Sequence, residues 1–216
     1  MRNTTFNINK YYYLCGGNKE NDKLFFDDTD RARFLFLILH MVSPTLINNT
    51  SYYINSFIKK RVFNINKTKL KEVVDSKYID VISFCITRNQ FHILVRPTKE
   101  GAVSIYMHRI LTSYSRYFNS KYKRVGHVFD GPYKASRVSG INGPLHISAY
   151  IHKGVFDSEN CNCENYIWSS FTDFINENRW GNLLNTNTIL RLVKNKSSYK
   201  NFVLDKKRST AEKALF

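Results

Sequence analysis

The stretch at residues 79–95 reads IDVISFCITRNQFHILV, two apolar runs separated by a short polar turn. β-branched and aromatic runs bounded by turn residues are typical of buried strands, so the stretch predicts two neighbouring strands or one long bent strand. In a strand, residues two apart point to the same face. Gln90 and His92 therefore lie side by side, and Phe91 points the other way. Any fold of this chain has to place an amide and an imidazole together on one face of a sheet.

Composition limits the class of protein and of partner. With 216 residues, 43% hydrophobic and 15% aromatic, the chain can bury a full core, which excludes disorder as its main state. It carries 33 Lys and Arg against 17 Asp and Glu, a formal charge of +16. This excess indicates a polyanionic partner; nucleic acid is the first interpretation and an anionic membrane the weaker one.

Neither a membrane span nor a signal peptide is expected. The longest apolar run near the start, FLFLIL at 34–39, is too short to cross a bilayer, and Arg31, Arg33 and His40 flank it. The beginning of the sequence has no apolar segment of the kind that a signal peptide requires. We therefore expect a cytoplasmic, nucleoid-associated protein with no membrane partner.

The cysteines do not form a zinc-binding pattern. They stand at positions 15, 85, 161 and 163, and the last two are one residue apart, without the spacing or the second pair of a zinc ribbon. Free thiols in a reducing compartment are the simpler interpretation.

The remaining elements alternate between strands and helices. Asp27 and Asp28 precede an amphipathic run at 29–42, where acidic residues favour the start of a helix. The other expected elements are a strand at 10–15 ended by a GGN turn, an insertion or helical piece at 48–71, a helix around 107–118, a β-hairpin at 126–138 turning at Asp130–Gly131, a helix at 145–152 and a helical region at 186–204.

This order predicts an α+β fold, with helices packed on one face of an antiparallel sheet. We expect a main domain at residues 1–180 and a basic, helical C-terminal extension at 181–216. By itself, His92 would be read as a hydrogen-bonded core histidine about as readily as a ligand.

An ordered set of segments resembles one known family. The segments are YYYLCGGNKENDKLFFDDTDRARFLFLI, NQFHILV, HRILTSYSRYFNSKYKRVGHVFDGPYKASRV, SAYIH and YIWSSFTDFI. In this order they are similar to the single-tyrosine HUH transposases, which include insertion-sequence transposases and the REP-associated tyrosine transposases. The resemblance implies a ferredoxin-like HUH nuclease sandwich, a homodimer, and cutting and rejoining of single-stranded DNA next to small hairpins.

The resemblance also implies roles for single residues. The nucleophile would be Tyr150, and a divalent metal, Mg²⁺ or Mn²⁺, would be held by Gln90 and His92. Two ligands on one face of a rigid strand can hold a hard cation against the scissile phosphate, which offsets the charge that develops there. Phenols are mostly protonated at neutral pH and need such help to form a 5′-phosphotyrosine.

The sequence departs from the family pattern at two metal-ligand positions. Gln90 stands where the family has its first histidine, although an amide oxygen is an ordinary, weaker ligand of hard cations. Gly154 stands where the family has a polar third ligand, one helical turn after Tyr150. His146, one turn before Tyr150, is a candidate replacement, whereas His152 is expected to point away.

Basic residues around the expected β-hairpin form a candidate nucleic-acid surface. They are Lys123, Arg124, Lys134 and Arg137, and they alternate with Phe129 and Tyr133. Phosphate contacts and base stacking suit such an arrangement, and a solvated basic face is the alternative. Trp168, Ser169 and Ser170 are expected to serve in packing and capping only.

Three functions remain open. The first is a metal-dependent transposase acting on hairpin-bearing single strands. The second is a non-catalytic hairpin-binding relative that has lost its metal site. The third is an RNA-binding protein on the same fold, because a basic sheet with aromatic side chains can bind either kind of single strand.

Overall fold

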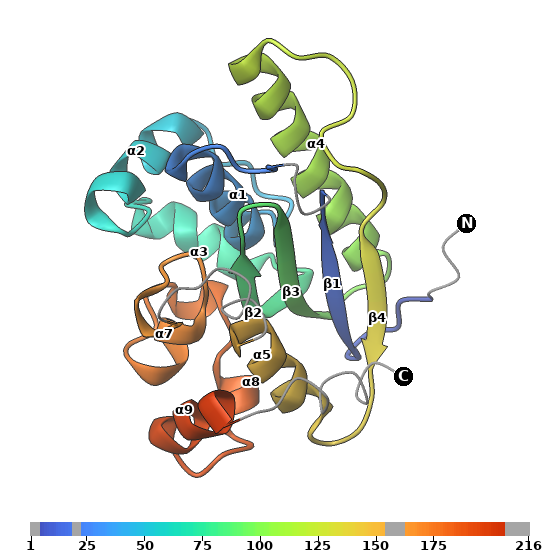
Figure 1. Cartoon of the computed structure of the whole chain (residues 1–216), viewed down its shortest axis with the longest axis vertical. Coiled ribbons are helices and arrows are strands. Elements are labelled where there is room, and N and C mark those ends of the chain that lie inside the picture. Colours follow the sequence, from blue (N-terminus) through green and yellow to red (C-terminus); the bar gives the residue numbers. More distant parts are fainter. Residues whose placement is uncertain (1–4, 19–22, 154–162, 206–216) are drawn as a thin grey trace.

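The computed structural model describes residues 5–18, 23–153 and 163–205 and is built on one four-stranded sheet (Figure 1). The strands are β1 (Tyr11–Gly17), β2 (Ile79–Ile86), β3 (Gln90–Pro97) and β4 (Lys134–Val138). They lie in the order β2-β3-β1-β4, and each neighbouring pair is antiparallel. The predicted α+β class is confirmed, and the stretch at 79–95 forms two strands.

Helices cover both faces of the sheet, so the expectation of a single covered face is wrong. Tyr12 and Leu14 of β1 point into the larger core with α1 (Asp28–His40) and α4 (Ala102–Tyr122). Tyr13, between them, points into a second core with α5 (Gly143–Lys153). The apolar run FHILV is continuous, as in strands buried on both faces, whereas a strand with one wet face alternates.

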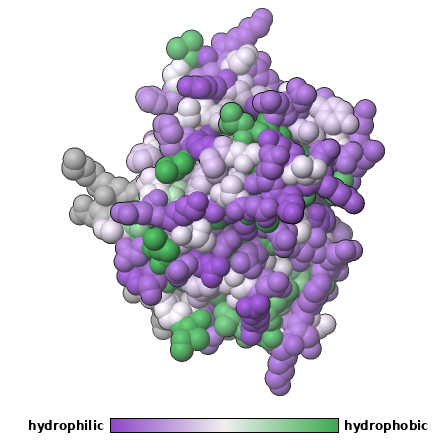
Figure 2. Space-filling model, turned by 180° about the vertical axis from the view of Figure 1, so that it is seen from behind, coloured by the Kyte–Doolittle hydropathy of each residue, from purple (hydrophilic) through white to green (hydrophobic). Residues whose placement is uncertain are grey.

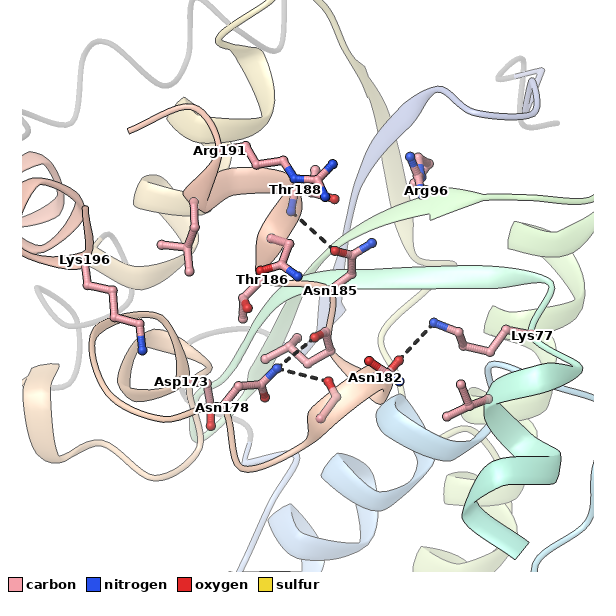
Figure 3. Close-up of a pocket in the computed structure, with 15 residues that line it drawn as sticks. Lys77, Arg96, Asp173, Asn178, Asn182, Asn185, Thr186, Thr188, Arg191 and Lys196 are labelled. Atoms are coloured by element: carbon pink, nitrogen blue, oxygen red, sulfur yellow. Dashed lines mark hydrogen bonds between the residues drawn. The ribbon is translucent and has the colours of Figure 1, made fainter. Parts of the chain in front are cut away.

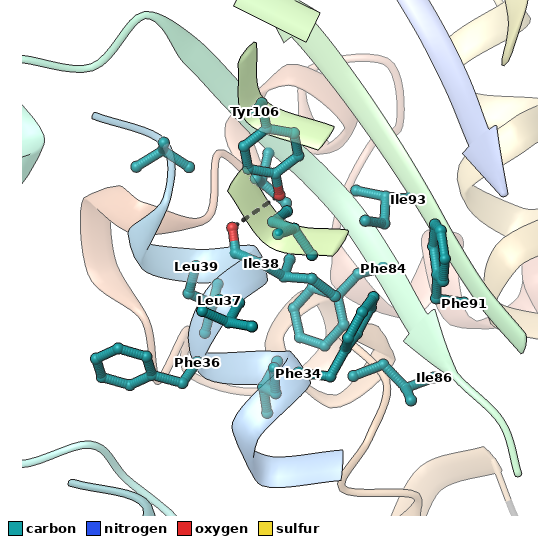
Figure 4. Packing of buried hydrophobic residues seen from close by; sticks show 14 of the residues in the cluster. Phe34, Phe36, Leu37, Ile38, Leu39, Phe84, Ile86, Phe91, Ile93 and Tyr106 are labelled. Carbon is teal, nitrogen blue, oxygen red and sulfur yellow. Dashed lines mark hydrogen bonds between the residues drawn. The ribbon is translucent and has the colours of Figure 1, made fainter. Parts of the chain in front are cut away.

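The predicted first helix is confirmed, and it packs directly on β2 and β3. Asp27 caps α1 in a capping box with Asp30, whose own side chain accepts from the backbone at the cap. Figure 4 shows Phe34 and Ile38 of α1 against Phe84 and Phe91 of the sheet. The buried hydroxyl of Tyr106 in α4 donates to the Ile38 carbonyl at 2.8 Å.

The segment at 48–71 contains α2 (Thr50–Lys60) and the start of α3 (Lys67–Asp75). The expected β-hairpin at 126–138 is wrong, since only its second arm is a strand. Residues 126–130 instead bury Val128 and pack Phe129 against Phe34, Phe91 and Tyr114. Burial of these side chains holds the segment in the core and away from the edge strand β4.

The C-terminal segment covers the edge of β2. Its short elements are η1 (Cys163–Asn165), α7 (Phe171–Ile175), η2 (Gly181–Leu183), α8 (Asn187–Leu190) and α9 (Lys196–Asp205). Ile86 N donates to Trp168 O at 3.0 Å, and Asn185 N donates to Val81 O at 2.8 Å. The outer backbone of β2 is thereby paired, which blocks association through an open strand edge. The division of the chain at residue 180 stays a prediction.

The buried His152 joins α5 to this segment. Its Nδ1 lies 2.7 Å from Tyr199 Oη of α9, and its Nε2 lies 2.7 Å from Ser170 Oγ. Ser170 Oγ in turn accepts from Phe84 N of β2 at 2.9 Å. As expected, His152 points away from Tyr150, and Ser170 is structural, although it links segments and does not cap α7 through its side chain.

The surface is mainly polar. Figure 2, seen from behind, shows hydrophilic residues over most of that face and hydrophobic ones in small, interrupted areas. Within the described ranges, no helix is both long and apolar enough to cross a bilayer.

Buried histidines make the stability of this fold sensitive to acid. Burial lowers the pKa of His152 to about 3 and that of His40 to about 4. An unfolded chain titrates its histidines near pH ~6.5, so below that pH the unfolded state binds more protons than the folded state. We expect the free energy of unfolding to fall from pH ~6.5 towards 4, by about 1.4 kcal/mol per pH unit for each such histidine.

Urea denaturation at several pH values measures this slope. His152→Gln, whose amide can donate and accept, should reduce the slope by about one proton. His127→Gln on the exposed surface should leave it unchanged. An unchanged slope in the His152 variant would contradict the assignment.

Candidate active site

One cavity brings together the expected nucleophile, both expected metal ligands and one of the expected basic residues. It has a volume of about 1120 Å³ and lies between β1, β3, β4, the loop before β4, and α5. Gln90, His92, Lys134 and Tyr150 all line it. The other lining residues are Tyr13, Cys15, Gly16, Gly17, Asn18, Asp130, Gly131, Pro132, Tyr133 and Ala135.

Strand register explains this convergence. Cys15 of β1 lies opposite His92 of β3 on one side and opposite Lys134 of β4 on the other. Directly opposed residues point to the same face of a sheet. The imidazole, the thiol and the lysine therefore form a row across three strands, on the face that α5 covers. Tyr150 of α5 stands over this row.

Gly17 keeps the end of β1 close to Gln90. The sequence predicted that GGN ends the strand, but β1 continues through Gly17, opposite Gln90. A Cβ at Gly17, whose φ is +150°, would lie 2.1 Å from Asn89 O, so no other residue fits. The close approach places the backbone of β1 against the turn that carries Gln90.

Tyr13 is the member of the site that the sequence analysis missed. Its hydroxyl lies 2.7 Å from Nδ1 of His92 within the buried face of the sheet. Its ring meets the ring of Tyr150 edge-on, with centroids 5.9 Å apart. Tyr13 thus touches both the expected metal ligand and the expected nucleophile. Only the pairing of β1 with β3 could have singled it out from its tyrosine neighbours.

Burial shifts the pKa values of three groups that line the cavity. Burial lowers the pKa of His92 to about 4 and raises that of Tyr13 well above its ordinary value. Burial also raises the pKa of the Cys15 thiol, although the hydrogen bond from Tyr13 and the charge of Lys134 oppose this. At neutral pH the imidazole, phenol and thiol are therefore uncharged.

The other expected site residues lie elsewhere. Lys123 and Arg124 are exposed at the end of α4, with the Arg124 guanidinium 5.7 Å from the Phe118 ring. Arg137 lies opposite Tyr12, which places it on the other face of β4 from Lys134. His146 does not line the cavity and packs against Phe202. Gly154 and Cys161 fall outside the described residues.

The donors in the cavity suit a hard cation only if a substrate completes its coordination. In the described part of the chain, no three His, Cys, Asp or Glu side chains come together as a metal site. Gln90 and His92 supply one amide and one imidazole on the same strand face. Mg²⁺ is commonly bound by few protein groups together with water and phosphate oxygens. A two-donor site facing an open cavity fits this mode of binding.

Comparison with known proteins gives two matches. The model of the family described as "Transposase IS200 like" matches residues 41–154. The chain is also similar to a solved structure of a REP-associated tyrosine transposase bound to a REP hairpin, with 8% identity and a TM-score of 0.50. That match covers 81% of this chain and 84% of the other. No curated protein sequence matches.

The hydrogen bond between Tyr13 and His92 makes a testable contribution to stability. Tyr13→Phe leaves Nδ1 of the buried imidazole without this partner, which should lower the free energy of unfolding by about 1–3 kcal/mol. In a double-mutant cycle with His92→Leu, the free energy of unfolding should fall less in the double variant than the two single losses added together. The double variant removes both polar groups and leaves neither unpaired. Chemical denaturation provides the measurement.

The matched control is Tyr52→Phe, the same chemical change at a side chain that is 62% exposed. It should cost almost nothing. Additive losses in the cycle would mean that the two side chains do not interact.

Proposed function

The chain belongs to the family of IS200-like transposases, and from this premise we propose that it binds hairpin-bearing single-stranded DNA and cuts and rejoins it through Tyr150. The observation that carries the proposal is the shared cavity, where Tyr150 faces the strand that bears Gln90 and His92. The cavity is concave and Lys134 lines it, so a cation is available to a phosphodiester bound there.

In the proposed reaction the Tyr150 hydroxyl attacks the phosphorus of the scissile phosphodiester. A bond forms between Oη and phosphorus, and the bond to the 3′ oxygen breaks. The phenol loses its proton and the 3′ oxygen gains one, so no other reactant is needed. The product is a 5′-phosphotyrosine, which keeps the bond energy for rejoining the strand.

The other residues of the cavity bind and orient the substrate. Lys134, in the row across the sheet, is placed to contact a phosphate of the strand. Gln90 and His92 would hold Mg²⁺ or Mn²⁺, which when bound offsets negative charge on the phosphate oxygens. Tyr13 fixes the orientation of the His92 ring through Nδ1.

The basic surface would extend this contact. Lys123, Arg124 and Arg137 are exposed and belong to a chain with a formal charge of +16. We propose that they contact the backbone of the DNA hairpin, that the protein acts as a homodimer, and that it works in the cytoplasm at the nucleoid. Affinity should then depend strongly on salt.

A specific observation favours a second candidate, a hairpin-binding protein without cleavage activity. Of the two expected metal ligands, one is a neutral amide in the place of an imidazole, and the described residues contain no cluster of three His, Cys, Asp or Glu side chains. Loss of a metal ligand or of its supporting contacts commonly costs ~10–100-fold in affinity or activity. Binding without covalent attachment would select this candidate.

A covalent adduct decides between the two. We expect incubation with a hairpin-bearing single strand and millimolar Mn²⁺ to give an adduct that mass spectrometry of the peptides locates at Tyr150. Tyr150→Phe should abolish the adduct without loss of DNA binding, because only the nucleophile is removed. Tyr52→Phe, the same change at an exposed tyrosine, should retain the adduct.

Three results would contradict parts of the proposal. Attachment at Tyr114 or Tyr117 of α4 would mean that another helix carries the nucleophile. Cleavage with no adduct would make the protein a hydrolytic nuclease. Preference for RNA over DNA of the same sequence would point to the RNA-binding alternative.

The identity of the two expected metal ligands, Gln90 and His92, gives a separate prediction. Gln90→His adds a second imidazole beside His92 and should raise both the affinity for Mn²⁺ and the cleavage rate, by about 10-fold or more. Affinity for Mn²⁺ is measured by isothermal titration of Tyr150→Phe proteins bound to the single strand, and the cleavage rate is measured with Tyr150 intact.

His92→Ala should abolish both Mn²⁺ binding and cleavage. If Gln90→His changes nothing while His92→Ala abolishes cleavage, Gln90 is not a ligand. If neither change has an effect, the cavity does not use a metal at this strand.

A further inference from the structure

A second cavity, of about 650 Å³, lies between the end of α3, β3 and the C-terminal segment (Figure 3). It shares no lining residue with the cavity of Tyr150. Four asparagines and two threonines line it together with the basic residues Lys77, Arg96, Arg191 and Lys196. Most of this lining lies beyond residues 41–154, the range that the family model matches.

The one acidic residue in the lining cannot repel an anion. Asp173 is 1% exposed, and its carboxylate is fully engaged. Oδ1 accepts from Arg179 Nε at 2.8 Å, and Oδ2 accepts from Arg179 Nη2 at 2.8 Å and from Trp180 Nε1 at 3.0 Å. The bidentate partner neutralises the carboxylate.

The basic residues leave an excess of positive charge. Lys77 and Arg96 share the carboxylate of Asp80, at 3.0 Å and 2.7 Å, so this group carries one net positive charge. Arg191 and Lys196 are exposed and pair with no acidic side chain in the described ranges. In Figure 3, Arg191, Lys196 and Lys77 stand on different sides of the hollow.

The walls of the cavity are formed before any ligand binds. Asn178 Nδ2 donates to Gly181 O and Leu184 O, both at 3.0 Å. Asn185 N donates to Val81 O of β2, and its Oδ1 accepts from Thr188 N at 3.3 Å. The loops that carry the polar groups are therefore fixed to the sheet, which lowers the entropic cost of binding.

We propose that this cavity binds one nucleotide unit of a strand, with the two phosphates that flank it at Arg191 and Lys196 and its base against the amides of Asn182 and Asn187. Amides present both donors and acceptors, as base edges do, and cations recognise the phosphate. The inference rests on the proposed function, because the nucleotide belongs to the strand held at Tyr150.

The position of Arg96 shows where the two cavities lie relative to each other on the sheet. Arg96 lies on the same face of β3 as Gln90 and His92, four residues beyond His92, or about 13 Å along the strand. Leu94, between them on this face, is buried beneath α5, so a strand that reaches both cavities has to pass around this helix. A longer single strand is therefore needed to place a nucleotide outside the hairpin in the second cavity. A free mononucleotide offers the same chemistry and has to be tested separately.

Fluorescence anisotropy with two oligonucleotides, of about 4 and about 16 nucleotides, tests the proposal. Arg191→Ala/Lys196→Ala should weaken binding of the longer strand about 10-fold and reduce its salt slope by about 1.4, the value for two phosphates. Binding of the short strand, which fills the cavity of Tyr150 alone, should change less than about twofold.

The matched control is Lys59→Ala/Lys60→Ala, which removes two exposed cations at the end of α2. It should leave the difference in affinity between the long and the short strand unchanged. Equal losses of affinity in the control and the test variant, or equal losses for both strands, would overturn the proposal. The electrostatic field of the whole basic protein would then explain them. No loss for the longer strand would also overturn it.

Calorimetric titration with a deoxynucleoside 5′-monophosphate separates the two sources of the nucleotide. Binding that the double variant abolishes, with no effect of strand length, would replace the DNA strand by a free nucleotide as the ligand. If the wild-type protein forms the Tyr150 adduct but the double variant weakens binding of neither the longer strand nor the mononucleotide, only the inference about this cavity fails. If it binds neither oligonucleotide, the proposed function fails with it.

Discussion

The buried imidazole of His152 fixes the position of α5, the helix that carries Tyr150. Through Tyr199 and Ser170 it ties α5 to the C-terminal segment and, through Ser170, to β2. Tyr150 lies two residues earlier on the same helix. A hydrogen-bonded network in a low-dielectric interior admits few other arrangements, because each unpaired group would be costly. The network therefore fixes the helix of the proposed nucleophile over the sheet.

The sheet gives the two cavities a common frame. Its face under α5 carries Gln90, His92 and Arg96 along one strand, with the first two in the cavity of Tyr150 and the last in the polar cavity. The opposite face, with α1 and α4, is apolar core. The proposed site residues thus lie on the face that packs a second core against α5, whereas the opposite face packs the larger core, as the alternation of side chains along a strand permits.

The local sequence pattern predicted many of the helices and strands. It failed where burial of side chains competed with strand pairing. The capped helix after Asp27, the paired placement of Gln90 and His92 and the helix around Tyr150 were all predicted from spacing and capping. The β-hairpin at 126–138 was wrong, because Val128 and Phe129 gain more from the core than from pairing. The second covered face was missed, because a continuous apolar strand does not show which helices pack on it.

By itself the sequence determined the excess of positive charge, the succession of strands and helices, and the two polar side chains on one strand face. These follow from composition and from periods of 2.0 and 3.6 residues, which are local. Only the tertiary structure decided that Tyr13 and Lys134 join His92, and that polar loops of the C-terminal segment enclose a basic cavity beside Arg96. The register between strands distant in sequence sets those neighbours, and many non-local contacts that no single segment encodes fix that register.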